Sequence, residues 1–215
     1  MEIRIASKVL KSVLLLALIS VRMSAIELPA DKYYLLKIEK GQRPDNLFGE
    51  HLWTVAKING LSPELMLPGK VLKIPYDFIW AQNWSPLPEA LDQYQEIEKI
   101  IFIDLSEQWL GAYESGQLIF SGPICSGIRG QDKKGRSKYP TPIGNFKIER
   151  REFKHFSNKF RVWMNYTLFF YGGFAIHAGI LFGQPASGGC VRLFPKDAEW
   201  LFNWAEIGTK VVIVK

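Results

Sequence analysis

Cys190 and His177 are the side chains whose types and surroundings could support nucleophilic catalysis. A cysteine becomes a strong nucleophile when an imidazole takes its proton and keeps the sulfur ionised. Gly188 and Gly189 precede Cys190, so the backbone can approach a substrate closely and turn N–H groups can point at an oxyanion. Taken alone, the pair favours a buried cysteine and a core histidine, because two cysteines and three histidines bring such pairs together by chance.

A mainly β fold with short helices must position these two residues. Apolar segments bounded by turn residues predict the strands. They cover residues 100–103, 109–114, 117–124, 143–149, 162–170, 173–177 and 211–214. His177 ends one of these strands, and Cys190 lies in a glycine-rich loop before a helix predicted over residues 195–205. Pro195 suits the first turn of that helix, whose apolar residues fall on one face.

Three segments around these residues provide a context that the pair alone lacks. They are Thr141-Pro-Ile-Gly-Asn-Phe146, Ala175-Ile-His-Ala-Gly179 and Ser187-Gly-Gly-Cys-Val-Arg-Leu193, in this order and with β segments between them. This set closely resembles the catalytic domain of the L,D-transpeptidase family, which carries a Thr-Pro-x-Gly-x-Phe turn, then Ile-His, then Ser-His-Gly-Cys-x-Arg. The resemblance covers over half the chain, and we expect residues 96–215 to form this domain, a β-sandwich.

The resemblance implies a role for each residue at a matching position. Cys190 would be the nucleophile, and His177 the general base and later the acid. The backbone carbonyl of Ala178 would orient the imidazole in place of a carboxylate. Backbone N–H groups of Gly189 and Cys190 would stabilise the tetrahedral oxyanion. Ser187 would shape the loop.

Gly188 departs from the family's pattern, because the family carries a histidine at this position. The change removes a donor and a bulky side chain beside the nucleophile, which bears on efficiency and specificity more than on the reaction. Arg192 would either hold the loop by hydrogen bonds, the alternative that we favour, or meet a substrate carboxylate. Tyr171 and Phe174 would line the substrate cleft.

The implied reaction is acyl transfer on peptidoglycan stem peptides. Cys190 would attack the carbonyl of the third residue of a tetrapeptide stem, expel D-alanine and form a thioester. The amine of a second stem would then give a 3→3 crosslink, water would give carboxypeptidase activity, and a protein lysine would anchor a protein to the wall. The resemblance implies neither a metal nor an organic cofactor, and it makes carbapenems expected inhibitors.

Other classes of protein are weighed against this one. A non-catalytic peptidoglycan-binding protein that keeps the fold is the alternative, and Gly188 is its sequence argument. A papain-like protease fails because its cysteine precedes its histidine, whereas here His177 comes first. A nucleic-acid binder is disfavoured because the basic residues form no recognised motif. We expect a monomer whose partners are peptidoglycan stem peptides and glycan strands.

The N-terminal part of the chain predicts an export signal. Residues 1–25 combine basic residues, a short apolar run and small residues near Ala25, as a secretory signal peptide does. A buried N-terminal helix or an uncleaved anchor is the alternative, although the apolar run is too short to span a bilayer as a helix. We therefore expect the mature protein in the periplasm or at the cell wall.

A small module and a linker are expected next. Residues 31–75 predict a β-helix-helix-β unit, in which a helix over residues 52–58 is followed by one that begins after Ser62-Pro63. The unit resembles the LysM module, which binds N-acetylglucosamine-containing glycans, through residues 52–53, 58–61 and 67–75. A unit that only packs on the second domain is the alternative. Residues 76–95 predict a linker that is partly docked through its aromatic side chains.

The net charge of +6 is unevenly distributed along the chain. Residues 26–128 carry 8 basic and 14 acidic side chains, whereas residues 129–215 carry 15 basic and 6 acidic ones. We interpret the basic part as a field that draws in carboxylate-bearing stems, with a solvated loop as the alternative.

The remaining cysteine and histidines lie outside the motifs. Cys125 could bond to Cys190 in an oxidising compartment, but we expect it to be free and buried. His51 and His155 have no motif around them, and we expect surface or packing roles for both.

Overall fold

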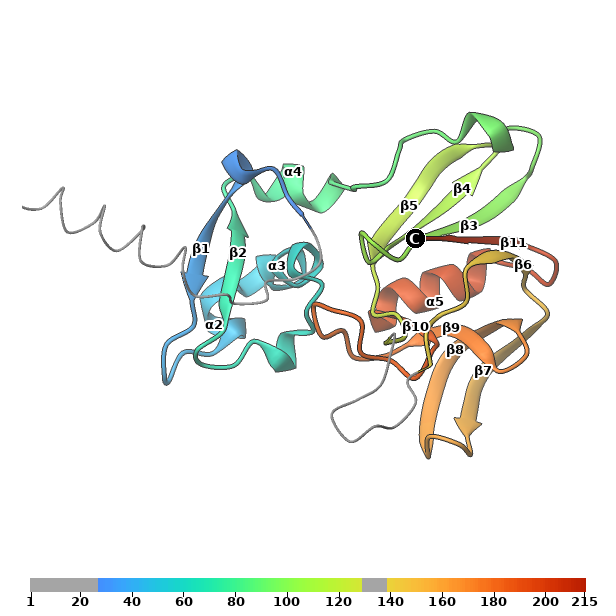
Figure 1. The fold of residues 1–215 in the computed structure, drawn as a ribbon. Coiled ribbons are helices and arrows are strands. Elements are labelled where there is room, and N and C mark those ends of the chain that lie inside the picture. Colours follow the sequence, from blue (N-terminus) through green and yellow to red (C-terminus); the bar gives the residue numbers. More distant parts are fainter. Residues whose placement is uncertain (1–26, 129–138) are drawn as a thin grey trace, which may run out of the picture.

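The computed structural model describes residues 27–128 and 139–215, so the export signal expected in residues 1–25 lies outside the described residues. The chain forms an N-terminal β-α-α-β region, a connecting segment and a larger sheet domain (Figure 1). The elements of the first region are η1 (Ala30–Lys32), β1 (Tyr33–Lys37), α2 (Pro44–Phe48), η2 (Gly49–His51), α3 (Leu52–Asn59), η3 (Pro63–Leu65) and β2 (Val71–Pro75). Strands β1 and β2 pair antiparallel.

Helix α3 is joined to β2 by the buried side chain of Asn59. Its amide nitrogen donates to the carbonyls of Val55 and Lys73, both at 2.8 Å, and its oxygen accepts from the N–H of Lys73 at 2.9 Å. Gly60 then ends the helix in the left-handed conformation that favours glycine. One prediction was wrong here: the segment after Ser62 forms only a single 3₁₀ turn, because Met66 leaves helical geometry. The two α-helices of the region are α2 and α3.

The segment expected to be a linker is ordered and docked. It contains α4 (Phe78–Asn83) and η4 (Asp92–Tyr94). The carboxylate of Asp77 caps α4 by accepting from the N–H groups of Ile79 and Trp80, at 2.9 and 3.0 Å. Trp84 packs edge-on against Trp109 of the sheet domain, with ring centroids 5.4 Å apart. The contact between Trp84 and Trp109 ties the segment to the sheet domain.

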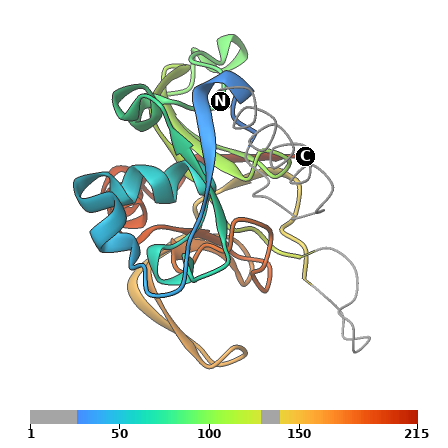
Figure 2. The same ribbon diagram turned by 90° about the vertical axis from the view of Figure 1, so that its left-hand side faces the viewer.

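In the residues that the structure describes, the larger domain consists of two sheets and one α-helix. The first sheet has the order β5-β4-β3-β11-β6, and the second has the order β10-β9-β8-β7. The strands of the first are β3 (Lys99–Asp104), β4 (Trp109–Glu114), β5 (Gln117–Pro123), β6 (Gly144–Lys147) and β11 (Lys210–Val214). Those of the second are β7 (Arg150–Ser157), β8 (Val162–Tyr171), β9 (Phe174–Ala178) and β10 (Val191–Leu193), and the helix is α5 (Pro195–Trp204). The hairpin of β7 and β8 projects from the body in both views (Figures 1 and 2).

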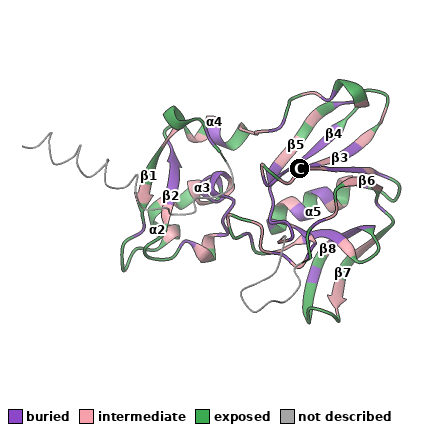
Figure 3. Ribbon diagram, in the orientation of Figure 1, coloured by how far each residue is buried: buried purple, intermediate pink, exposed green. Residues whose placement is uncertain are grey.

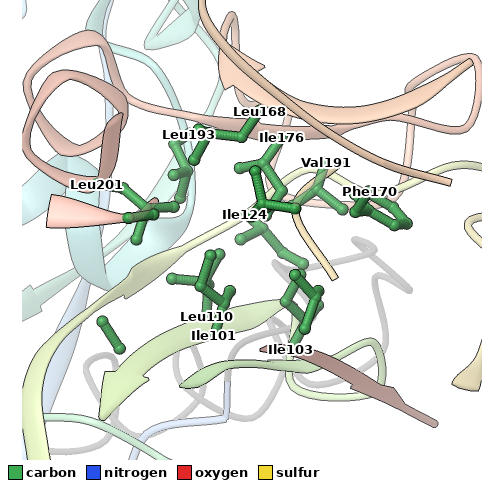
Figure 4. Close-up of a cluster of buried hydrophobic side chains, with 14 of the residues drawn as sticks. Ile101, Ile103, Leu110, Ile124, Leu168, Phe170, Ile176, Val191, Leu193 and Leu201 are labelled. Atoms are coloured by element: carbon green, nitrogen blue, oxygen red, sulfur yellow. The ribbon is translucent and has the colours of Figure 1, made fainter. Parts of the chain in front are cut away.

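The hydrophobic core lies between the two sheets and α5 (Figure 4). Ile101 and Leu110 point into it from the first sheet, Ile176 and Val191 from the second, and Leu201 from α5. Because side chains alternate along a strand, the neighbours of these residues on β9 and β10 face away from the core. Ala175 and His177, the neighbours of Ile176 on β9, are nevertheless buried as well. Burial falls off toward the tip of the projecting hairpin (Figure 3). No helix in the described part of the chain is both long and apolar enough to cross a membrane.

Candidate active site

Strands β9 and β10 bring His177 and Cys190 to the same face of the second sheet. The two strands pair in parallel, with Val191 opposite Ile176 and Arg192 opposite His177. Val191 and Ile176 point into the core, so Cys190, Arg192 and His177 lie on the opposite face. This face lies outside the main core, and on it Cys190 is partly exposed whereas His177 is buried.

The imidazole of His177 is almost fully buried, with 6% of its surface exposed. Its Nδ1 lies 2.8 Å from the carbonyl oxygen of Ala178. A carbonyl only accepts, so Nδ1 carries the proton and Nε2 is left with a free lone pair. Burial lowers the pKa of His177 to about 4. The hydrogen bond to the Ala178 carbonyl acts to raise this pKa, whereas the positive charges of Arg192 and His155 lower it further. The imidazole is therefore neutral at neutral pH.

The thiol of Cys190 sits partly buried in a small apolar cluster. Its neighbours there are Met164, Phe169 and Ala175. Burial raises the pKa of the thiol, although the backbone of Ala175 and the charge of Arg192 act in the opposite direction. The thiol of Cys190 and the imidazole of His177 are accordingly both neutral at neutral pH.

The loop before Cys190 is closed by the side chain of Ser187. The hydroxyl donates to the carbonyl of Cys190 and accepts from the N–H of Gly189, the latter at 3.1 Å. Gly189 has φ +112, and a Cβ there would lie 2.6 Å from the ring of Phe174. Glycine is required at this position for both reasons.

Thr141 connects this loop to two distant parts of the chain. Its buried hydroxyl accepts from the N–H of Gly127 and donates to the carbonyl of Gly189, both at 2.8 Å. The Thr-Pro turn therefore holds the peptide next to Cys190 in place. The motif was recognised in the sequence, but this role of Thr141 was not, because the residues that it joins lie 14 and 48 positions away.

Phe160 fills the space that Gly188 leaves open. It lies in the turn between β7 and β8, and a Cβ added at Gly188 would be 2.6 Å from its Cζ atom. Tyr139 meets the same ring edge-on at 6.3 Å. Nothing in the sequence connects Phe160 with the loop, so this neighbour of the active site was missed.

The other residues predicted for the site lie around it at different distances. Phe174 contacts Gly189, and Tyr171 stacks on Phe174 with ring centroids 6.1 Å apart. The alkyl part of Arg192 lies against Gly179. Its guanidinium makes no hydrogen bond or ion pair with any residue that the structure describes, so the expected hydrogen bonds to the loop are not seen.

The two cysteines are both free, as expected. Cys125 is fully buried, and its backbone exchanges hydrogen bonds with Arg192. His155 also matches its expected packing role, since it lies edge-on to Phe169 at 5.0 Å and 2.7 Å from a carboxylate oxygen of Glu152. In the described ranges, 27–128 and 139–215, there is no cluster of three or more side chains suited to a metal ion.

Comparison with known proteins identifies the class. The sequence profile of the L,D-transpeptidase catalytic domain (YkuD) matches residues 98–213, more than half of the chain. This chain therefore belongs to the L,D-transpeptidase family. The match starts after the N-terminal β-α-α-β region, which it leaves unassigned. No curated protein matches the chain.

Solved structures agree with this assignment. An L,D-transpeptidase (Yku) from Stackebrandtia nassauensis is similar at 28% identity and a TM-score of 0.51, over 64% of this chain and 65% of that one. This chain thus spans less than two thirds of that relative. Residues 123–326 of an L,D-transpeptidase from Xylanimonas cellulosilytica are similar at 25% identity and a TM-score of 0.56, over 87% of this chain and 100% of that one.

Proposed function

We propose that this protein is a peptidoglycan L,D-transpeptidase that acts on tetrapeptide stems through a thioester on Cys190. The observation that carries the proposal is the hydrogen bond from Nδ1 of His177 to the carbonyl of Ala178. It leaves Nε2 as a base on the face of the sheet that also presents Cys190. Membership of the L,D-transpeptidase family supplies the reaction class and the peptidoglycan substrate.

Acylation uses the neutral resting pair. The Sγ atom of Cys190 forms a bond to the carbonyl carbon of the third stem residue while its proton passes to Nε2 of His177. The resulting oxyanion accepts from the N–H groups of Gly189 and Cys190. In the free enzyme the Gly189 N–H is held by Ser187 at 3.1 Å, a long bond that an oxyanion would replace. The imidazolium then protonates the amine of D-alanine as the C–N bond breaks.

Deacylation transfers the acyl group to an amine. The acceptor nitrogen attacks the thioester carbon, gives its proton to His177 and forms the new amide bond. The sulfur leaves and takes the proton back from the imidazolium, which restores both neutral groups. A second stem as acceptor yields a 3→3 crosslink, a protein lysine yields an anchored protein, and water yields the free acid.

We assign Arg192 to the recognition of a stem carboxylate. Its guanidinium has no counter-charge among the described residues and lies on the face that carries His177 and Cys190. A guanidinium pairs well with a carboxylate through two parallel hydrogen bonds. Phe174 and Tyr171 form an aromatic wall beside the loop and would contact the rest of the stem.

Mass spectrometry of a disaccharide-tetrapeptide incubated with the enzyme tests the proposal. We expect loss of D-alanine and formation of a crosslinked dimer, and we expect a carbapenem to add covalently to the protein. Cys190→Ala should abolish all three, whereas Cys125→Ala, a matched removal of the other thiol, should preserve them. Intact substrate and no carbapenem adduct under reducing conditions would instead support a non-catalytic peptidoglycan-binding protein.

We further propose that residues 31–75 act as a LysM-like module and that the protein works outside the cytoplasm, where peptidoglycan lies. A cleft of about 350 Å³ runs between the loop before α2 and the turn before β2, and the exposed Leu67 lines it. Co-sedimentation with purified peptidoglycan should weaken in Leu67→Ala and remain unchanged in Ile79→Ala, an exposed apolar control on α4. Equal sedimentation of both variants and the parent would exclude a glycan site in this cleft.

A further inference from the structure

A second and larger cleft lies between the N-terminal region and the sheet domain. Its volume is about 840 Å³, and neither Cys190 nor His177 lines it. One wall comes from α3 and α4, and the other from β5 and the first turn of α5. The walls carry both apolar and polar groups, which is the composition of a site for a small polar molecule.

The carboxylate of Asp197 is the first feature that points to a ligand. It lies partly buried at the start of α5, and no described residue forms a hydrogen bond or an ion pair with it. Burial raises the pKa of Asp197 to about 6, which the charge of Lys57 opposes. A carboxylate withdrawn from water normally gains donors in return, so this one lacks partners that a ligand could supply.

Lys57 faces the same cleft from α3. Its Nζ donates to the carbonyl of Gln82 at 2.6 Å, and burial lowers its pKa. The exposed Glu50 and Lys196 also line the cleft, so its walls carry two basic and two acidic groups, of which Lys57 and Asp197 have limited access to solvent. An anion would be repelled by Asp197 and a cation by Lys57, so a neutral ligand rich in hydroxyl and amide groups suits it best.

Trp53 supplies the apolar part of the recognition. It meets Phe194 edge-on with ring centroids 5.5 Å apart, and 50% of its surface stays exposed. A half-exposed indole in a cleft offers a flat surface to the C–H face of a pyranose ring, while its N–H can serve a hydroxyl. The polar residues Gln82 and Ser121 line the same space.

We propose that this cleft binds an N-acetylhexosamine unit of a glycan strand, with Trp53 under the sugar ring and Asp197 accepting from its hydroxyl or amide groups. The site is distinct from the cleft beside Leu67, because the two share no lining residue. The identity of the sugar rests on the proposed function, in which peptidoglycan is the substrate of the enzyme. Binding here would hold the strand while its stem is processed at Cys190, which does not line the cleft.

Calorimetric titration with a β-1,4-linked N-acetylglucosamine tetramer tests the site. The parent is Cys190→Ala, so the result does not depend on whether stems are processed, and failure of the proposed reaction stays distinguishable. We expect Trp53→Ala and Asp197→Ala each to weaken binding at least about tenfold. Asp197→Asn, which keeps one acceptor oxygen, should weaken it less.

Two controls make the outcome decisive. Trp163→Ala removes another exposed indole outside the cleft and should leave binding unchanged. Leu67→Ala reports on the other cleft. The proposal is overturned if the parent does not bind, if Trp53→Ala and Asp197→Ala bind like the parent, or if only Leu67→Ala loses affinity. Melting temperatures of all variants establish that a loss of binding is not a loss of folding.

Discussion

Replacing Thr141 by valine removes one hydroxyl and keeps almost the same shape. That hydroxyl is 2.8 Å from both the N–H of Gly127 and the carbonyl of Gly189, and Thr141 is only 3% exposed. Valine therefore leaves one donor and one acceptor buried without partners. Each such group costs about 1–3 kcal/mol. Allowing for some relaxation of the loop, we expect a loss of about 3 kcal/mol, which lowers the Tm by about 6–12 °C.

The same substitution should slow the reaction. Gly189 carries one of the two N–H groups that we assign to the oxyanion, and its peptide loses a tether in Thr141→Val. Loss of one oxyanion donor costs ~10²–10³ in rate, so we expect kcat to fall by up to that factor with a smaller change in KM. Thermal unfolding gives the stability, and release of D-alanine from saturating stem peptide gives kcat.

Two further variants separate the hydrogen bonds from other effects. Thr141→Ser keeps the hydroxyl and should retain most of the stability and rate. Thr209→Val removes a buried hydroxyl that accepts from Glu206 at 2.9 Å, far along the chain from the loop, and should reduce stability without reducing kcat. If Thr141→Val melts and turns over like the wild type, Thr141 does not hold the loop, and the reasoning is refuted.

Four further predictions follow from the same geometry. Gly188→His should lower the free energy of unfolding by about 1–3 kcal/mol because its Cβ would meet Phe160. Adding Phe160→Ala should recover most of that loss. A double-mutant cycle measured by urea unfolding tests this, and the absence of coupling between the two positions would contradict the contact. Because the pKa of His177 is about 4 in the folded chain and ordinarily 6.5, the unfolded chain binds the proton first, so the free energy of unfolding should fall by about 3 kcal/mol as pH drops from 6.5 to 4. In a pH series of urea titrations, His177→Asn should lack this decrease in the free energy of unfolding. If the variant loses stability in parallel with the wild type, His177 is not the group responsible. Arg192→Ala should raise KM about tenfold for stems with a free terminal carboxylate but not for amidated stems, and equal effects on both would argue against carboxylate binding. Activity should be the same with and without reductant, since Cys125 and Cys190 are both free; activation by reductant would point to a bond between them.

The sequence predicted much of the second sheet and α5 because their patterns are local. The strand expected over residues 173–177 is β9, and the helix expected over 195–205 is α5. Strand β7 was missed because charged and aromatic side chains mix along it, and it gains its stability from pairing with β8. Strand β10 was missed because it has only three residues, too few to show an alternation of apolar and polar side chains. Both depend on partners that a local pattern does not contain.

The sequence by itself determined which residues can do chemistry and where the chain turns. Cys190, His177 and the glycines of the loop were predicted from three ordered motifs that resemble the L,D-transpeptidase family, each of which spans only a few positions. Only the tertiary structure decided the protonation of His177, since burial sets its pKa. It also decided that Thr141 holds Gly189 and that Phe160 occupies the space beside Gly188. Desolvation and contact depend on which atoms pack together, and distant segments supply those atoms.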